Sequence, residues 1–387
     1  MHKDKYVFAQ LVSFLERNKF NYIVRKYNGD KYVKHFTCWN QLLSLMFGQL
    51  SNRESLRDLI VALDAHHSKS YHLGLGKNIS KSSLARANQD RDYHIFEEYA
   101  YYLVNEARQK RVADIFKLEG NVYAFDSTTI DLCLSVFWWA KFRKNKGGIK
   151  VHTLYDVETQ IPTFFHITEA SVHDSTAMKE IPYESGSYYI FDRAYNHFKM
   201  LYKIHQIGAF FVLRAKKNLQ YYIIKWKRRL PKNVLSDVII ELTGFYPKQY
   251  YPAHLRLVRY WDEEQKRELV FLTNAMHISA LQVAELYKNR WQVELFFKWL
   301  KQHLKIKKFW GTTENAVRIQ IYAAMCTYCL VAIVQKDMQL DRSTYEVLQI
   351  LSISLTDKTH LRDLFDRTKF QNDKERFRLN EPNLFNF

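Results

Sequence analysis

Apolar residues recur with two different spacings along the 387-residue chain. Over residues 1–115 they return every three or four positions, as at Phe8, Leu11 and Leu15, and this spacing predicts amphipathic helices. From about residue 118 the apolar runs are short and rich in β-branched and aromatic residues, which is typical of strands. We therefore expect strands at 121–132, 149–157, 161–168, 187–192 and 209–214, with helices at 174–181 and 196–207.

A second group of strand-like runs, at residues 220–269, interrupts this alternation of strands and helices. Its last two runs, LRLVRYW and RELVFLTN, are separated by the polar segment DEEQK, so we expect the insertion to end in a hairpin. One long helix over 279–305, an apolar helix near 315–335 and a charged tail follow. The expected fold class is α/β: a mixed sheet flanked by helices, interrupted by a β-rich insertion and preceded by a helical region.

Lysine and arginine together number 58 and aspartate and glutamate 40, which gives a formal net charge of +18 and a pI near 9.5. This excess favours a polyanionic partner, and nucleic acid is the leading candidate. A protein with a well-solvated basic surface would have the same composition. Because 47% of the residues are hydrophobic, the chain can bury a large core, and its length predicts two or three structural units.

The four cysteines do not predict a disulfide framework, because only Cys326 and Cys329 are close together. This pair lies in an apolar run without a nearby histidine or second pair to complete a zinc site, so we expect two core thiols. The N-terminus lacks the apolar stretch of a secretory signal, and the longest apolar run, around 321–334, is too short to span a bilayer. A cytoplasmic protein is expected.

The segment at 78–92, NISKSSLARANQDRD, predicts a capped helix with long polar side chains. Ser80 and Ser82 are the candidate N-caps. A helix of this kind that follows another helical segment can read DNA, which makes Lys81 and Arg86 candidate DNA-binding residues. An ordinary solvated helix is the alternative. The polar residues of the segment include Lys81, Arg86, Asn88, Gln89 and Arg91.

The helix expected over 279–305 has an unusual polar face, in which one acid lies among several bases. A solvated helix usually mixes charges for pairing four residues apart, whereas a sole carboxylate among bases suits a site where it holds a cation and the bases hold phosphates. Simple pairing of Glu294 with Arg290 or Lys298 is the alternative. The face contains Tyr287, Arg290, Trp291, Glu294, Lys298, Lys301 and Lys305, and the opposite face Leu286, Val293, Phe296, Leu300 and Leu304.

Two further carboxylates stand in strand-like segments. Asp126 lies within the apolar run YAFDSTT, where a charge is unfavourable unless a functional site or a counter-charge accounts for it. Asp192 ends the run in YYIFDRAY, and the carboxyl ends of strands are where open α/β sheets bind ligands. A turn residue or a helix cap is the alternative for Asp192.

Two strand acids and one helical acid can converge on one point, and three carboxylates suit Mg²⁺, which prefers oxygen ligands. In a two-metal site one ion activates the attacking water or 3′-hydroxyl and the other stabilises the leaving 3′ oxygen, which is phosphodiester hydrolysis or transesterification. Glu285 lies about 180° from Glu294 on the helix and so faces away from the basic side chains. The rival acids that are close in sequence are Asp131, Asp156, Asp174 and Glu285.

These motifs resemble a known family. The spacing Tyr287-x2-Arg290-x3-Glu294-x6-Lys301 resembles the YREK signature of the bacterial insertion-sequence transposases of family 4. FDST at Asp126 and FDRAY at Asp192 are similar to that family's first and second acidic motifs, and the separations of 66 and 102 residues fit an insertion before the third acid. The resemblance is strong over roughly 120–330 and weaker over 36–100, which is similar to the N-terminal domain often attached to these transposases.

The resemblance implies a ribonuclease H-like catalytic core at 116–219 and 270–335, split by the insertion at 220–269. It further implies a helical DNA-binding region at 1–115 and a C-terminal helical or tail region at 336–387. The implied activity is that of a DNA transposase, which cuts at transposon ends and transfers the strands into target DNA. The implied partners are the terminal inverted repeats, the target DNA and a second copy of the chain, in the bacterial cytoplasm at the nucleoid.

The resemblance also implies roles for individual residues. Asp126, Asp192 and Glu294 would be the catalytic residues and the ligands of two Mg²⁺ ions, with Mn²⁺ as a substitute. Arginine suits phosphate because its planar fork forms two hydrogen bonds. The residues expected on DNA phosphates are Tyr287, Arg290 and Lys301, with Lys298 as a further candidate.

Some features leave alternatives open. His152 and His173 resemble recurrent family positions without an evident role, and structural hydrogen bonding is the alternative. Family members that stabilise a flipped base use a tryptophan on the insertion hairpin, where this chain has Leu269; Trp261 and Trp226 are candidate substitutes, and core packing is their alternative. Two other functions are possible: a ribonuclease H-like nuclease or resolvase without strand transfer, and a DNA-binding protein without catalysis.

Overall fold

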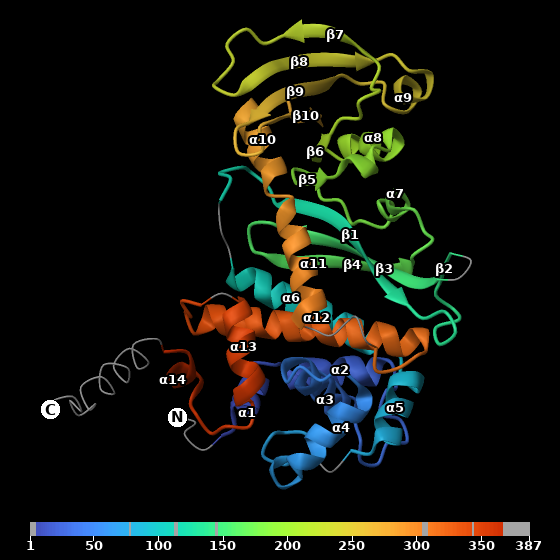
Figure 1. The fold of residues 1–387 in the computed structure, drawn as a ribbon, viewed down its shortest axis with the longest axis vertical. Coiled ribbons are helices and arrows are strands. Elements are labelled where there is room, and N and C mark those ends of the chain that lie inside the picture. The colour runs from blue at the N-terminus through green and yellow to red at the C-terminus, as the bar shows by residue number, and fades with distance from the viewer. Residues whose placement is uncertain are drawn as a thin grey trace, which may run out of the picture. The chain divides into compact units, whose positions relative to one another are not determined.

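The computed structural model describes residues 5–76, 79–111, 115–143, 146–303, 309–342 and 344–366. The chain forms two compact units. One comprises residues 1–110 and 300–387, and its described part is helical; the other comprises residues 111–299 and carries the strands (Figure 1). The domain ranges expected from the sequence stay a prediction.

The helical unit is built around α12 (Glu314–Asp337), which packs against α3 (Cys38–Leu50) and α6 (His94–Lys110). At 24 residues α12 is longer than the apolar run expected from the sequence, and by length and composition it could cross a membrane. However, 94% of its most apolar window is buried inside the protein, as in a core helix. Cys326 and Cys329 form no disulfide bond and are buried there, which confirms the two core thiols. The other helices are α1 (Val7–Val12), α2 (Arg17–Lys26), α4 (Leu56–Ala65), α5 (Lys81–Asp90), α13 (Thr344–Ser354) and α14 (Leu361–Phe365), with a 3₁₀ helix at His67–Lys69.

The capped helix expected at 78–92 is α5, and Ser80 is its cap, since its hydroxyl oxygen accepts a hydrogen bond from the amide of Ser83 at 3.1 Å. Lys81 and Arg86 are exposed. Asn88, in contrast, is buried and accepts a hydrogen bond from the side chain of Gln41 at 2.8 Å. Arg91 donates to the same Gln41 side chain at 2.9 Å. These two polar residues therefore hold the helix in its unit.

The strands of the second unit form one ten-stranded mixed sheet. In its first part, β1 pairs in parallel with β5, which pairs in parallel with β6, whereas β3 pairs antiparallel with both β1 and β4. The α/β class and the strands expected here are confirmed. Their bounds are β1 (Val122–Leu132), β2 (Lys141–Arg143), β3 (Lys146–Asp156), β4 (Ile161–Glu169), β5 (Tyr188–Phe191) and β6 (Phe210–Arg214), with helices α7 (Asp174–Ala177) and α8 (Phe198–Gln206).

The insertion extends the same sheet, because its last strand β10 pairs antiparallel with β6. The expected hairpin is formed by β9 and β10, and β7 is the edge strand. A short helix, α9, was not expected from the sequence. The bounds are β7 (Tyr221–Trp226), β8 (Val234–Leu242), α9 (Phe245–Tyr250), β9 (Leu255–Asp262) and β10 (Arg267–Thr273).

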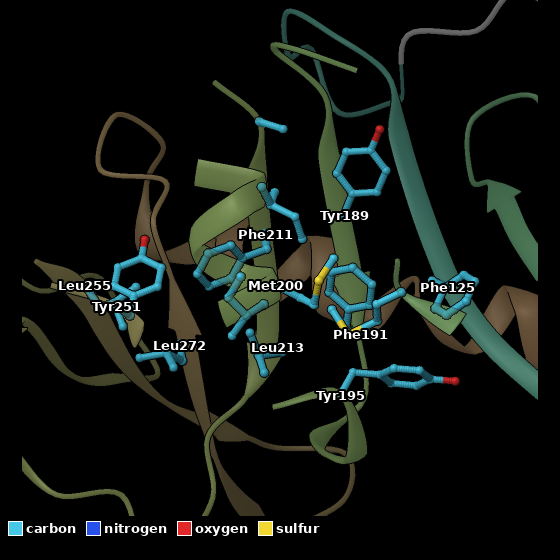
Figure 2. Close-up of a cluster of buried hydrophobic side chains, with 14 of the residues drawn as sticks. Phe125, Tyr189, Phe191, Tyr195, Met200, Phe211, Leu213, Tyr251, Leu255 and Leu272 are labelled. Carbon is cyan, nitrogen blue, oxygen red and sulfur yellow. The ribbon is translucent and has the colours of Figure 1, made fainter. Parts of the chain in front are cut away.

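One row of paired residues crosses the sheet from β1 to the edge strand β7. Phe125 pairs with Phe191, Phe191 with Leu213, and the row continues through β10, β9 and β8 to Trp226. Most of this row belongs to a single buried cluster, which Met200 of α8 covers (Figure 2). The full row is Phe125, Phe191, Leu213, Leu272, Leu257, Val238 and Trp226.

The single long helix expected over 279–305 is wrong. The structure has two helices, α10 (Ala280–Lys288) and α11 (Trp291–His303), separated by Asn289 and Arg290. The Asn289 side chain donates to the carbonyl of Glu285 at 3.0 Å and accepts from the Gln292 side chain at 2.7 Å, and such side-chain bonds compete with the helical ladder. The apolar face is buried as expected at Leu286, Val293, Phe296 and Leu300, whereas Leu304 and Lys305 lie outside the described residues.

Candidate active site

The two strand acids follow the last paired residues of neighbouring parallel strands. β1 and β5 pair as far as Phe125 and Phe191, so Asp126 and Asp192 occupy equivalent positions at the carboxyl edge of that pairing. Asp192 precedes a 3₁₀ helix at Arg193–Tyr195, but its side chain does not cap it. Instead it accepts a hydrogen bond from the Tyr287 hydroxyl at 3.2 Å. The carboxylate is therefore held by the tyrosine of the YREK motif, which lies on α10, and the helix-cap alternative does not apply.

Arg290 connects the other two acids. Its Nη1 donates to Oδ2 of Asp126 at 2.9 Å and its Nη2 to Oε1 of Glu294 at 2.6 Å. Arg290 therefore does pair with Glu294, four residues later, as the alternative from the sequence had it. The same guanidinium also pairs with Asp126 on β1. The position of Arg290 between α10 and α11 lets its fork reach β1 and α11 together.

Negative charge is concentrated around Asp126. Burial raises the pKa of Asp126 to about 6; the Ser127 amide and Arg290 lower it, and the charges of Glu294 and Asp192 raise it further. Burial also raises the pKa of Tyr287 to about 12, so at neutral pH its hydroxyl keeps the proton that it donates to Asp192. Three carboxylates near one another, in a partly buried place, form a site that a cation stabilises.

The carboxylate oxygens of Asp126, Asp192 and Glu294 are of the type that divalent cations prefer. In the described part of the chain, no group of three His, Cys, Asp or Glu side chains has a metal-binding arrangement, and Arg290 lies between Asp126 and Glu294. The donor chemistry therefore fits a metal, whereas its binding requires Arg290 to release the acids.

The rival acids have other partners or positions. The Asp174 carboxylate accepts from the Ser127 hydroxyl at 2.7 Å and pairs with Lys150 at 3.1 Å, so it supports the strand next to Asp126. Asp156 is buried and accepts from the amides of Glu158 and Thr159, as a turn residue does. The two remaining rivals, Asp131 and Glu285, are exposed.

Two arginines at the same edge were not expected from the sequence. Arg214 follows Leu213, which pairs with Phe191, so it lies beside Asp192 at the carboxyl end of the next strand. In the described residues, the Nε atoms of Arg193, Arg214 and Arg290 are buried without a hydrogen-bond partner, which is unusual for a polar group. Arg193 belongs to the FDRAY motif, whereas only the strand register marks Arg214.

The remaining basic candidates lie on α11. Lys298 is exposed and Lys301 is partly buried. The two histidines have structural partners: Nε2 of the fully buried His152 lies 3.1 Å from Oγ1 of Thr168, and His173 caps α7 by accepting from the amide of Ser175. Burial lowers the pKa of His152 to about 4. These contacts support the structural alternative for both histidines.

A cavity of about 710 Å³ lies next to the site, between the β9–β10 hairpin and α10. Tyr287 and Arg290 line one side of it, and Tyr260 and Leu269 line the other. The two tryptophans considered for base stabilisation do not line it. Trp261 is 39% exposed on β9, and Trp226 is 61% exposed on the edge strand, so core packing does not explain Trp226.

Acids stand at the carboxyl edge of the parallel strands, beside buried arginine Nε atoms that have no partner among the described residues, and this combination is typical of a protein that binds phosphate groups. The chain belongs to the family of the Transposase DDE domain, whose model matches residues 117–330. A domain of unknown function matches residues 3–76. The fold of the second unit is accordingly ribonuclease H-like, and the protein is a DDE transposase, an enzyme that acts on DNA and whose domain implies a divalent metal.

Curated relatives support the same family. A protein of Sinorhizobium fredii named as a transposase is 34% identical over 73% of this chain and 77% of its own length. A protein of Geobacillus stearothermophilus, named as a transposase for an insertion sequence element, is 31% identical over 53% of this chain and 54% of its own length. A third, of Synechocystis and similarly named, is 24% identical over 73% of this chain and 80% of its own length. The predicted insertion-sequence transposase is therefore confirmed.

Proposed function

We propose that this transposase works by cut-and-paste transposition. It recognises the terminal inverted repeats of its element, nicks the ends, releases the element and directs the 3′-hydroxyl groups onto target DNA. The observation that carries this proposal is the register of β1 and β5, which brings Asp126 and Asp192 to adjacent strand ends, together with the link from Asp126 through Arg290 to Glu294.

We assign Asp126, Asp192 and Glu294 as the catalytic residues and metal ligands. Two Mg²⁺ ions, or Mn²⁺ in their place, supply Lewis acidity and an activated oxygen nucleophile when bound. Tyr287 orients Asp192 through its hydroxyl. Arg290 exchanges its two carboxylate partners for a DNA phosphate, because its guanidinium fork fits either acceptor.

The same edge offers the donors for DNA. Arg193 and Arg214 have buried Nε atoms there that bond to none of the residues the structure describes, and Lys298 is exposed on α11. Tyr287 and Lys301 complete the proposed phosphate contacts near the cut. In the helical unit, exposed Lys81 and Arg86 of the capped helix α5 contact the terminal repeat.

The proposed active form is a homodimer on DNA in the bacterial cytoplasm, because both ends of an element must be cut in one assembly. In the proposed division of labour, residues 1–115 bind DNA, residues 116–219 and 270–335 form the catalytic core, and residues 336–387 are a C-terminal region. The insertion at 220–269 extends the core.

A strand-transfer assay with pre-cut ends tests this proposal. The ends are taken from short inverted repeats in the DNA that flanks the gene. We expect joined products with Mg²⁺, none with Asp126→Asn or Glu294→Gln, and retained, salt-sensitive DNA binding by both variants. Hydrolysis of the ends without joined product would contradict transposition, and joined product with either variant would contradict the assigned site.

A further inference from the structure

The edge strand of the insertion presents aromatic and basic side chains to solvent. Tyr222 and Trp226 of β7 are 71% and 61% exposed. The segment 220–232 carries five lysines and arginines and no acid. Exposed apolar groups of this size mark interaction surfaces, and aromatic side chains between cations are typical of surfaces that bind nucleic acid. We define the edge strip as Tyr222, Lys225, Trp226, Arg228 and Arg229.

The cations of the edge strip are available to an anion. Two neighbouring lysines, Lys227 and Lys232, pair with Asp237 at 3.5 Å and Glu263 at 3.6 Å. In the described part of the chain, no carboxylate forms an ion pair with Lys225, Arg228 or Arg229. Three exposed positive charges that no carboxylate of the described residues neutralises are electrostatically suited to a polyanion.

Strand direction brings the edge strip to the same side of the sheet as the catalytic acids. β7 runs parallel to β1, because three antiparallel pairings separate β6 from β8 and a fourth reverses the direction again at β7. Trp226 is the last member of the row that begins at Phe125. Lys227 follows Trp226 as Asp126 follows Phe125, and Arg228 and Arg229 come directly after Lys227, so they extend beyond the same carboxyl edge.

The distance from β1 to β7 along that edge can be expressed as a number of base pairs of duplex DNA. Six strand-to-strand steps separate β1 from β7. At roughly 4.8 Å per step the strip lies about 29 Å from the catalytic strand. Since duplex DNA rises about 3.4 Å per base pair, this span corresponds to about eight or nine base pairs.

We propose that the edge strip is a second DNA-binding surface, which holds the duplex about eight or nine base pairs from the cleaved bond. The cations contact phosphates, and Tyr222 and Trp226 pack against the sugar edge or an unpaired base. This inference rests on the proposed function, since it places the strip on the DNA that the acids cut. A second copy of the chain is a poorer occupant of the exposed β7 edge, because two such basic segments repel each other.

The test compares a triple variant, Lys225→Ala, Arg228→Ala and Arg229→Ala, with a charge-matched control, Lys179→Ala, Lys199→Ala and Lys203→Ala, which changes exposed lysines elsewhere. Fluorescence anisotropy measures the binding of blunt duplexes of about 6 and about 16 base pairs over a range of salt. Thermal unfolding checks that both variants fold, as the exposure of these side chains predicts.

We expect the strip variant to bind the longer duplex roughly tenfold more weakly, with the slope of log K against log salt reduced by about 2 to 3. The shorter duplex, which cannot span both surfaces, should bind the variant and the wild type alike. Trp226→Ala should weaken binding of the longer duplex a few-fold without changing the salt slope.

An equal loss in the charge-matched control, or an unchanged salt slope in the strip variant, overturns the inference. So does a concentration-dependent dimer that Trp226→Ala abolishes, which would assign the strip to a second copy. These outcomes leave strand transfer by the wild-type protein intact, whereas failure of the proposed function removes strand transfer itself.

Discussion

Two of the arginine–carboxylate networks in the strand-bearing unit differ in whether their donors are satisfied. In the insertion, Arg256 and Asp237 are almost fully buried, and the guanidinium donates to both oxygens of Asp237 at 2.8 and 2.7 Å. Its third nitrogen donates to the carbonyls of Ala275 and Ile278. At the catalytic edge, Arg290 also contacts two carboxylate oxygens, but its Nε has no partner among the described residues, and Glu294 is exposed.

The difference separates a structural ion pair from a functional one. A buried pair in which every guanidinium nitrogen is hydrogen-bonded fixes the connection between β8, β9 and the chain after β10. The network at the proposed site leaves the Arg290 Nε without a partner among the described residues and gathers negative charge, so under the proposed function a metal and DNA would stabilise it. Such networks are destabilising until the ligand binds.

The largest expected effect comes from exchanging one acid in each network. Asp237→Asn leaves Arg256 as a buried, uncompensated charge, and we expect a loss of about 3 to 5 kcal/mol in the free energy of unfolding. Asp126→Asn removes a metal ligand, and cleavage should fall by roughly a thousand-fold or more. Urea unfolding and single-turnover cleavage measure the two quantities.

The free energy of unfolding of Asp126→Asn gives a second comparison between Asp126 and Asp237. Because the folded pKa of about 6 exceeds the ordinary value of 3.8, ionised Asp126 destabilises the fold above pH 6, by up to roughly 3 kcal/mol. The variant should therefore be as stable as the wild type or more stable at pH 7.5. It should also lose the rise in unfolding temperature that Mn²⁺ gives the wild type. A clear destabilisation would make Asp126 a structural residue like Asp237.

A smaller effect is expected from His152, which lies beneath the site with its ring stacked on Phe125. Its pKa is lowered from 6.5 to about 4, so the unfolded chain binds a proton that the folded chain does not. Stability should be lost as the pH falls from 6.5 towards 4, by up to roughly 3 kcal/mol. His152→Gln should remove this loss.

Asp126 titrates in the opposite sense over the same range, so the measurement is made in the Asp126→Asn background. Urea unfolding at several pH values compares that single variant with the Asp126→Asn, His152→Gln double variant. If both have the same pH dependence, His152 does not contribute as its burial predicts.

Substitution of Arg290 tests whether cleavage depends on the positive charge of this side chain or on the two hydrogen bonds that its planar guanidinium can form. Arg290→Lys keeps the charge but loses the bidentate fork, and we expect cleavage to fall by about 10- to 100-fold. Arg290→Gln also removes the charge that lowers the pKa of Asp126, so Asp126 should ionise at higher pH. Mn²⁺ binding measured from pH 5.5 to 8.5 should show an upward shift for Arg290→Gln only. An equal shift for Arg290→Lys and Arg290→Gln would mean that the pH dependence of Mn²⁺ binding changes because the guanidinium geometry is lost, and not because the charge is lost.

The smallest effect is expected in the helical unit. Lys81→Ala with Arg86→Ala removes two exposed cations from α5, so affinity for the terminal repeat should fall a few-fold and the salt slope by about 2. Gln89→Ala on the same helix is the uncharged control. Unchanged affinity for the repeat would favour the solvated-helix interpretation.

Much of the secondary structure and the family of this protein could be predicted from local sequence patterns. Strand periodicity predicted β1, β3 to β6 and the hairpin of β9 and β10, because alternation and polar turns are properties of short segments. The motifs around Asp126, Asp192 and Glu294 likewise depend on short spacings, and the match to the Transposase DDE domain confirmed the family that they indicated.

Other features depend on residues that are distant in sequence. The break between α10 and α11 follows from side-chain hydrogen bonds of Asn289 that helical periodicity does not register. The partner of Arg290 on β1 is 164 residues away, and Arg214 joins the catalytic edge only through the register of three strands. The sequence by itself determined which segments become helices, strands and turns and which acids are candidates, because these are local preferences. The tertiary structure alone decided which charges distant in sequence meet, because that depends on strand order and register.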